Sequence, residues 1–176
     1  FTTYVSGFGS ADTENITAEE LGSGETKTIT IGDKQYTIKN TTGRKNVVLY
    51  TYNDVTGEVG FCGSNLNINA QKDVSHNVNI NGRIINFYGG DKDDVIVNNA
   101  NNGYIYGLGG NDKITLSSYT GMGSYAYGGD GDDEIILNDS GGRVFGQNGD
   151  DKITINAASR FEINGGVGND TYYINK

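Results

Sequence analysis

Residues 126–137 read AYGGDGDDEIIL and hold three aspartates and one glutamate within five positions. Three glycines lie among or just before these acids, and three aliphatic residues follow them. Acidic side chains this close repel one another, and glycine disfavours both helix and strand. The stretch is therefore unfavourable by itself, and its role has to come from the sequence around it.

The stretch belongs to a set of five related segments in the second half of the chain. GGDKDDVIV begins at Gly89, GLGGNDKIT at Gly107, GGDGDDEII at Gly128, GQNGDDKIT at Gly146 and GGVGNDTYY at Gly165. Their starts are 18, 21, 18 and 19 residues apart. Each segment has glycine first, aspartate sixth and a large apolar or aromatic residue eighth. Self-similarity of this kind predicts a solenoid in which each repeat stacks on the next.

A coil of about 18 residues has room for two short strands and two turns. The residue two positions before each opening glycine and the eighth residue of each segment should both face inward, because alternate strand residues share a face. This predicts two facing ladders, Phe87-Ile105-Ala126-Val144-Ile163 and Ile96-Ile114-Ile135-Ile153-Tyr172. Stacking at about 4.8 Å would also align the sixth-position carboxylates in one column of repelling charges: Asp94, Asp112, Asp133, Asp151 and Asp170.

The segments resemble the nonapeptide G-G-x-G-x-D-x-U-x of the RTX family, in which U is a large apolar residue. The resemblance covers residues 87–176, and GGDGDDEII fits every fixed position. It implies an all-β fold, namely a right-handed parallel β-roll or β-helix with about five coils and a column of calcium ions on one edge. Calcium takes six to eight oxygen ligands, so the ions would neutralise the aspartate column.

By the same resemblance, about four calcium ions would each lie between two successive turns. The earlier turn would offer the carbonyls of its second and fourth residues and its aspartate. The later turn would offer the carbonyls of its first and third residues and its own aspartate. The first site would use Gly90, Lys92, Asp94, Gly107, Gly109 and Asp112, the second Leu108, Gly110, Asp112, Gly128, Asp130 and Asp133, the third Gly129, Gly131, Asp133, Gly146, Asn148 and Asp151, and the fourth Gln147, Gly149, Asp151, Gly165, Val167 and Asp170. Lys92 stands where the family pattern has glycine, so the first site departs most from that pattern.

The turns between the segments carry no such motif. They read NNANNG (98–103), SSYTGMGS (117–124), NDSGG (138–142) and NAASRF (156–161), and they can take up all the length variation between coils. We therefore expect ions along one edge and a variable, ion-free opposite edge. Aromatic residues also recur just before four of the opening glycines, at Tyr88, Tyr106, Tyr127 and Phe145. They either stack across strands for stability or form a strip that contacts a glycan or a protein.

Residues 1–64 are expected to form a β-rich module or cap. The alternation in residues 26–39 predicts a hairpin in which Ile29 and Ile31 face Tyr36 and Ile38. Residues 46–52 and 58–63 are predicted strands, whereas TAEEL (17–21) is interpreted as one helical turn with an N-terminal capping box. Residues 65–86 are ion-free strands, which are either coils leading into the roll at 87–176 or the last strands of a small β-domain.

The chain has one cysteine, Cys62, and one histidine, His76. Cys62 alternates with apolar strand residues and is predicted to be buried, whereas His76 lies in the polar turn KDVSHN and is predicted to be solvated. A single cysteine excludes an internal disulfide. The sequence contains no HExxH, GxSxG or P-loop motif, so we predict that this chain is not an enzyme.

The formal net charge of −9 argues against binding to nucleic acid or an anionic membrane surface and is compatible with cations. Without calcium, the acidic half should be largely disordered, and calcium binding would supply folding free energy. The resemblance then implies a calcium-binding structural module of a secreted or cell-surface bacterial protein, such as an adhesin exported by type I secretion. Two alternatives are the C-terminal accessory module of a secreted enzyme or toxin, and a glycan-binding module.

Overall fold

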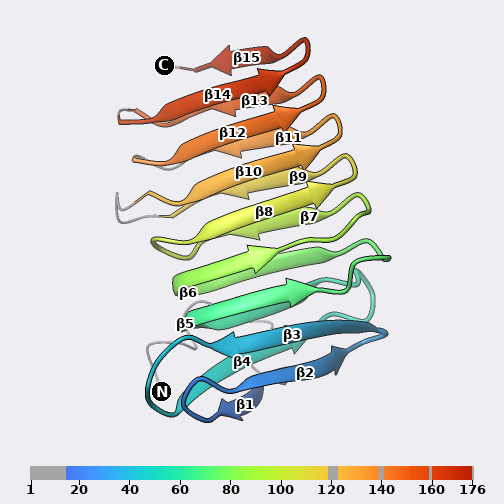
Figure 1. The fold of residues 1–176 in the computed structure, drawn as a ribbon, viewed down its shortest axis with the longest axis vertical. Coiled ribbons are helices and arrows are strands. Elements are labelled where there is room, and N and C mark those ends of the chain that lie inside the picture. Colours follow the sequence, from blue (N-terminus) through green and yellow to red (C-terminus); the bar gives the residue numbers. More distant parts are fainter. Residues whose placement is uncertain (1–14, 119–122, 139–140, 159, 176) are drawn as a thin grey trace.

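The computed structural model describes residues 15–118, 123–138, 141–158 and 160–175. These residues fold almost entirely into β-strands, which join in one continuous hydrogen-bonded sheet (Figure 1). The strands are β1 (Thr17–Leu21), β2 (Thr26–Ile31), β3 (Lys34–Asn40), β4 (Asn46–Tyr52), β5 (Val59–Ala70), β6 (Asn77–Tyr88), β7 (Val95–Asn98), β8 (Tyr104–Gly109), β9 (Lys113–Leu116), β10 (Tyr125–Asp130), β11 (Glu134–Leu137), β12 (Arg143–Asn148), β13 (Lys152–Ile155), β14 (Glu162–Val167) and β15 (Thr171–Ile174).

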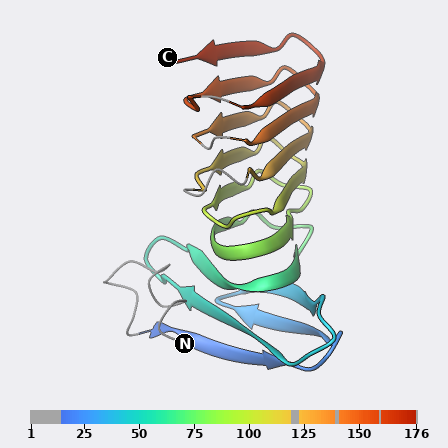
Figure 2. The ribbon, with the colours of Figure 1, turned by 90° about the vertical axis from the view of Figure 1, so that its left-hand side faces the viewer.

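From β5 onward the chain forms a parallel β-solenoid of about six turns, which confirms the predicted fold class. One file of strands runs β6-β8-β10-β12-β14 and the other runs β6-β7-β9-β11-β13-β15, because the long strand β6 bends and pairs with both β7 and β8. The coils stack into a tall column that is seen edge-on in Figure 2. The arrangement is consistent with a right-handed coil, the hand that parallel crossovers take almost without exception.

The core of the solenoid is the narrow space between the two files, and it continues into the N-terminal module. Both predicted ladders run in register from coil to coil, and their members are fully buried up to the penultimate coil. The last coil differs, because β14 and β15 pair with described strands on one side only. Tyr172 aligns with Ile153 as predicted, yet it is 45% exposed, whereas Ile153 is completely buried. A coil in this stack is therefore buried by the neighbour that covers it.

The N-terminal strands form an antiparallel module on which the first coil rests. The predicted hairpin is present as β2 and β3, in which Ile29 lies opposite Tyr36. Strand β4 covers the predicted range 46–52, and both β3 and β4 pair with β5. Cys62 in β5 is buried, as predicted.

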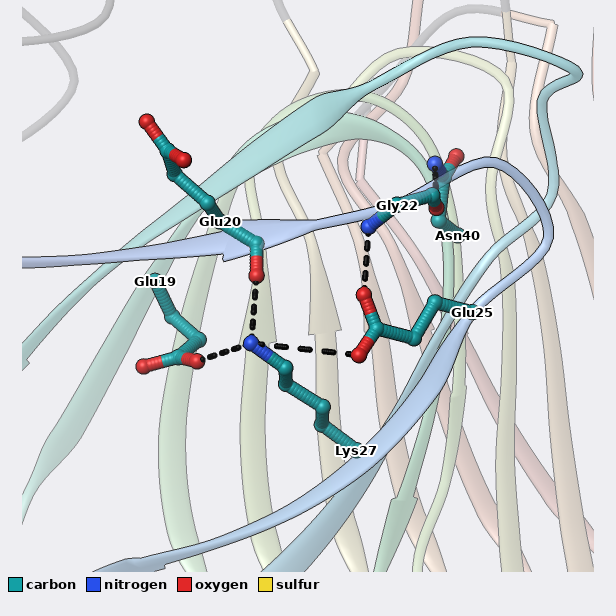
Figure 3. Close-up of polar contacts among 6 residues, drawn as sticks. All are labelled: Glu19, Glu20, Gly22, Glu25, Lys27 and Asn40. Atoms are coloured by element: carbon teal, nitrogen blue, oxygen red, sulfur yellow. Dashed lines mark hydrogen bonds and ion pairs between the residues drawn. The ribbon is translucent and has the colours of Figure 1, made fainter.

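The prediction of a helical turn at residues 17–21 was wrong, because this segment is strand β1. All five of its residues align with β4, and Leu21 at its end is buried. Figure 3 shows the polar contacts that hold β1 against β2. Lys27 Nζ donates to Glu19 Oε1 and to the Glu20 carbonyl, each at 2.7 Å. Edge pairing and this contact outweigh a weak local capping signal.

Candidate metal centre

The five sixth-position aspartates form one continuous column along the edge where β8, β10, β12 and β14 end, on the right in Figure 1. Neighbouring members are joined by hydrogen bonds in which each backbone N–H donates to the Oδ1 atom of the aspartate in the next coil. The three bonds from Asp94 to Asp112, from Asp112 to Asp133 and from Asp133 to Asp151 are 2.8 Å long, and the bond from Asp151 to Asp170 is 3.0 Å long. Each carboxylate thus belongs to two coils.

The second carboxylate oxygen is the unusual feature of the column. The Oδ2 atoms of Asp112, Asp133 and Asp151 are buried and accept no hydrogen bond among the described residues. Burial raises the pKa of Asp112 and of Asp133 to about 7, because the backbone N–H bonds only partly offset the loss of hydration and neighbouring carboxylates add repulsion. Burial also raises the pKa of Asp94 and of Asp151. An unpartnered buried carboxylate oxygen is costly unless a proton or a cation accompanies it.

The opening glycine of each segment makes room for this oxygen. A Cβ atom added to Gly128 would lie 2.2 Å from Asp133 Oδ2 and 2.7 Å from the carbonyl oxygen of Gly146 in the next coil. Gly107 and Gly146 have the same surroundings in their own coils. Strand pairing is also interrupted here, since the register passes from Tyr106–Tyr127 to Leu108–Gly129 and omits the opening glycines. In these three coils a carboxylate oxygen and a carbonyl oxygen therefore both lie beside the opening glycine, at the place that a Cβ atom would fill.

The glycines at the fourth position of each segment are needed for a different reason, namely the path of the backbone. At the fourth position, Gly110, Gly131, Gly149 and Gly168 all have positive φ, from 100° to 137°. A Cβ on Gly131 would lie 1.9 Å from the Gly110 carbonyl oxygen, which no side chain tolerates. Two non-glycine residues, Leu108 and Gln147, adopt positive φ at the second position, at 79° and 82°. These two turns keep the backbone path of the motif at the cost of strain.

The predicted ligands lie where the turns stack, but they differ in environment. The opening glycines and the aspartates up to Asp151 are buried, and Asp170 is partly buried. Other predicted ligands have exposed side chains, which a carbonyl ligand does not use: Lys92, Leu108, Asp130, Gln147, Asn148 and Val167. Three of the predicted carbonyl ligands accept backbone hydrogen bonds here: Gly90 from Gly109, Asn148 from Gly131, and Val167 from Gly149. Among the described residues no three His, Cys, Asp or Glu side chains converge as a metal site. The ligand sets remain predictions.

The prediction that His76 is solvated was wrong, because this side chain is 2% exposed. Its backbone N–H donates to Asp94 Oδ1 at 2.7 Å, so His76 takes the place of an aspartate at the head of the column. Its Nε2 lies 2.6 Å from the Gln71 carbonyl oxygen and its Nδ1 lies 2.9 Å from the Tyr36 hydroxyl. A carbonyl only accepts, so Nε2 carries a proton, and in the neutral imidazole Nδ1 accepts from the Tyr36 hydroxyl. His76 lies 18 residues before Asp94, and this repeat spacing was the available signal.

The aromatic residues before the opening glycines form a stacked column on the outside of the β6–β12 file. Ring centroids are 4.7 Å apart for Tyr88–Tyr106, 4.9 Å for Tyr106–Tyr127 and 5.0 Å for Tyr127–Phe145, with interplanar angles of 5–12°. The rings thus cover one another's faces, which is the cross-strand stacking predicted as one of the two interpretations.

Fold and site together define a parallel β-solenoid with a buried carboxylate column along one edge. No helix in the described part of the chain is long and apolar enough to cross a membrane. Comparisons with models of protein families, with curated proteins and with solved structures found no match to this chain.

Proposed function

We propose that the chain is a calcium-binding structural module whose solenoid folds when calcium occupies the aspartate column. The observation that carries this proposal is the set of three buried, unpartnered Oδ2 atoms in Asp112, Asp133 and Asp151. A hard divalent cation satisfies such atoms at neutral pH, where protonation is only partial for groups with a pKa of about 7. The donors nearby are all oxygens, which favours calcium over zinc or copper.

The residues that would hold the ions are the column aspartates and the carbonyls of the turns next to them. A bound ion would supply positive charge and coordination to the buried oxygens. The chain contributes the rest: the opening glycines keep the space open, the turn glycines allow coils to approach, and each Asp N–H fixes the carboxylate of the next coil. Each interior aspartate would serve the ion sites on both of its sides. An ion bound in one turn would therefore favour binding of an ion in the next turn.

The resemblance to the RTX nonapeptide supports a location outside the cell as well as calcium as the ligand. Extracellular calcium modules bind at about 10⁻⁴–10⁻³ M, a concentration found outside cells and not in the cytosol. The chain would thus remain unfolded before export by type I secretion and would fold as part of a secreted or cell-surface bacterial protein, such as an adhesin. An accessory module of a secreted enzyme or toxin would use the same chemistry, and no catalytic group in the chain is needed for either.

The test is a calcium titration of the metal-stripped chain, followed by far-UV circular dichroism. We expect a cooperative gain of β signal at submillimolar to millimolar calcium, and no comparable gain with magnesium, which prefers to keep its waters. Asp133→Ala should blunt the response. Asp132→Asn is the control, because Asp132 is adjacent and exposed, and asparagine keeps the oxygen that accepts the Asp150 N–H at 2.8 Å. A chain that is fully β in chelator and indifferent to calcium would refute the proposal.

A further inference from the structure

The edge opposite the aspartate column carries a second surface with a different character. Strands β8, β10, β12 and β14 begin there with Tyr104, Tyr125, Arg143 and Glu162, one residue per coil and in register. Tyr104 and Tyr125 stack with centroids 4.6 Å apart, and the Arg143 guanidinium lies 5.0 Å from the Tyr125 ring centroid. We call these residues, together with Asn102, Arg160 and Phe161, the variable-edge surface.

Two adjoining depressions hollow this surface. One has a volume of about 380 Å³ and is lined by Asn102, Tyr104, Gly123, Tyr125, Gly141 and Arg143. The other has a volume of about 270 Å³ and is lined by Gly141, Gly142, Arg143, Arg160, Phe161 and Glu162. They meet at Arg143, so together they follow the solenoid axis over successive coils. A ligand that fills both would be elongated and would span more than one coil.

The charge of the surface is opposite to that of the rest of the acidic half. Residues 86–176 contain thirteen acids and six bases, and the only two arginines among them, Arg143 and Arg160, both line these depressions. Arg143 bonds through Nε to Glu162 at 3.0 Å and through Nη1 to the Tyr125 hydroxyl at 2.5 Å. A guanidinium has five N–H donors, so two bonds leave others for an anionic group. Most of the acids lie in the motif turns at the far edge, whereas Glu162 lies at this surface and is paired with Arg143.

The aromatic rings at this surface differ from those of the stacked column formed by Tyr88, Tyr106, Tyr127 and Phe145. Tyr104 is 38% exposed and Phe161 is 37% exposed. Tyr104 is covered by Tyr125 on one side, but its neighbour in β6 is Asn86 in place of a ring, and the Tyr104 N–H donates to Asn86 Oδ1. Exposed aromatic rings next to amide, hydroxyl and guanidinium groups suit a ligand that is both ring-shaped and polar.

We propose that the variable-edge surface binds an acidic polysaccharide chain, one whose sugar rings carry carboxylate or sulfate groups. The sugar rings would lie against Tyr104, Tyr125 and Phe161, and their anionic groups would bond to Arg143 and Arg160. This use of the surface rests in part on the proposed calcium binding, since four calcium ions would add eight positive charges to a formal net charge of −9. Without that compensation the chain repels a polyanion at long range.

Binding is tested by fluorescence anisotropy with a labelled hyaluronan decasaccharide, whose uronate sugars stay soluble in calcium. The full chain is used in millimolar calcium, with a neutral dextran oligomer and an oligoglutamate as comparison probes. We expect binding to hyaluronan only. Arg143→Gln should weaken it by about tenfold or more, the effect of losing a charge-assisted hydrogen bond. Tyr104→Ala should weaken it as well.

Lys113→Gln is the matched control, because it removes the same charge from the exposed face of β9, where Lys113 is paired with Glu134. This variant should bind like the wild type, and circular dichroism should show all variants folded. Absence of binding by a folded wild type, equal binding of oligoglutamate or dextran, or equal losses from the Arg143 and Lys113 variants would each overturn the proposal. Hyaluronan binding that persists in chelator would support the binding surface but contradict its dependence on calcium.

Discussion

Replacing Asp133 by asparagine should change the stability of the solenoid in opposite directions with and without calcium. Asp133 Oδ1 accepts the N–H of Asp112, and an amide oxygen can accept the same bond. The orphaned Oδ2 would become an amide NH₂ group facing the same space as the Gly146 carbonyl oxygen, to which it can donate. Asparagine therefore keeps the shape of the site and removes the buried charge.

The size of the effect follows from the pKa of this carboxyl, which burial raises from 3.8 to about 7. At pH 8 and without calcium, ionising Asp133 in the folded chain costs at most about 4 kcal/mol relative to the unfolded chain. Asp133→Asn should recover a substantial part of that in chelator. With saturating calcium the sign reverses, because the wild type gains from the ion and the variant has lost a charged ligand.

The assay is urea denaturation followed by far-UV circular dichroism at pH 8, in chelator and in millimolar calcium. A higher urea midpoint, or a gain of β signal where the wild type has none, reports stabilisation in chelator. Asp132→Asn is the control, since it removes the same charge from an exposed neighbour. A variant that is destabilised in both conditions, or a control that reverses sign in the same way, would refute the reasoning about the orphaned oxygen.

Three further predictions follow from the same geometry. Gly131→Ala should destabilise the calcium-loaded chain by about 2 kcal/mol or more, because its Cβ would lie 1.9 Å from a carbonyl oxygen. Gly109→Ala should be tolerated, because the nearest atom to its Cβ would be 3.6 Å away, and thermal melts compare the two variants. In chelator, lowering the pH from 8 toward 5 should increase the β signal, because between the ordinary pKa of 3.8 and the raised pKa of about 7 the folded chain binds more protons than the unfolded chain. The calcium concentration at the folding midpoint should rise over the same pH range, because protons compete with the ion. A β signal that falls on acidification would contradict this reasoning. Tyr36→Phe should cost about 1–3 kcal/mol by urea denaturation, since it leaves the buried His76 Nδ1 without its donor, and an unchanged midpoint would show that the pair contributes nothing.

The periodic half of the fold could be predicted from sequence because one rule repeats in every coil. The inward ladders and the aspartate column follow from residue spacing alone, and the structure places them in register. The N-terminal module carries no repeat, so its pairings depend on distant partners. TAEEL reads locally as a helical turn, yet it is a strand because β4 aligns with all five of its residues.

Parts of the site also depend on the neighbouring coil and could not be read from one segment. In Asp112, Asp133 and Asp151, Oδ1 is satisfied while Oδ2 is orphaned, and this follows from how successive coils are aligned. The burial of His76 could not be predicted from its local sequence, which is polar. The available signal was its separation from Asp94 in the sequence, which equals the repeat length. The exposure of Tyr172 likewise reflects the position of its coil in the stack.

The Tyr36–His76 pair gives the solenoid a direction of assembly. At this end, the Tyr36–His76 side-chain hydrogen bond anchors the coil to the N-terminal module. The His76 backbone N–H bonds to Asp94 Oδ1 without adding another acidic side chain to the column. Each later coil is aligned by parallel strand pairing and by the hydrogen bond that the N–H of the preceding aspartate donates to it. We therefore expect the N-terminal module to act as the template, with coils adding from Asp94 toward Asp170 once calcium is present.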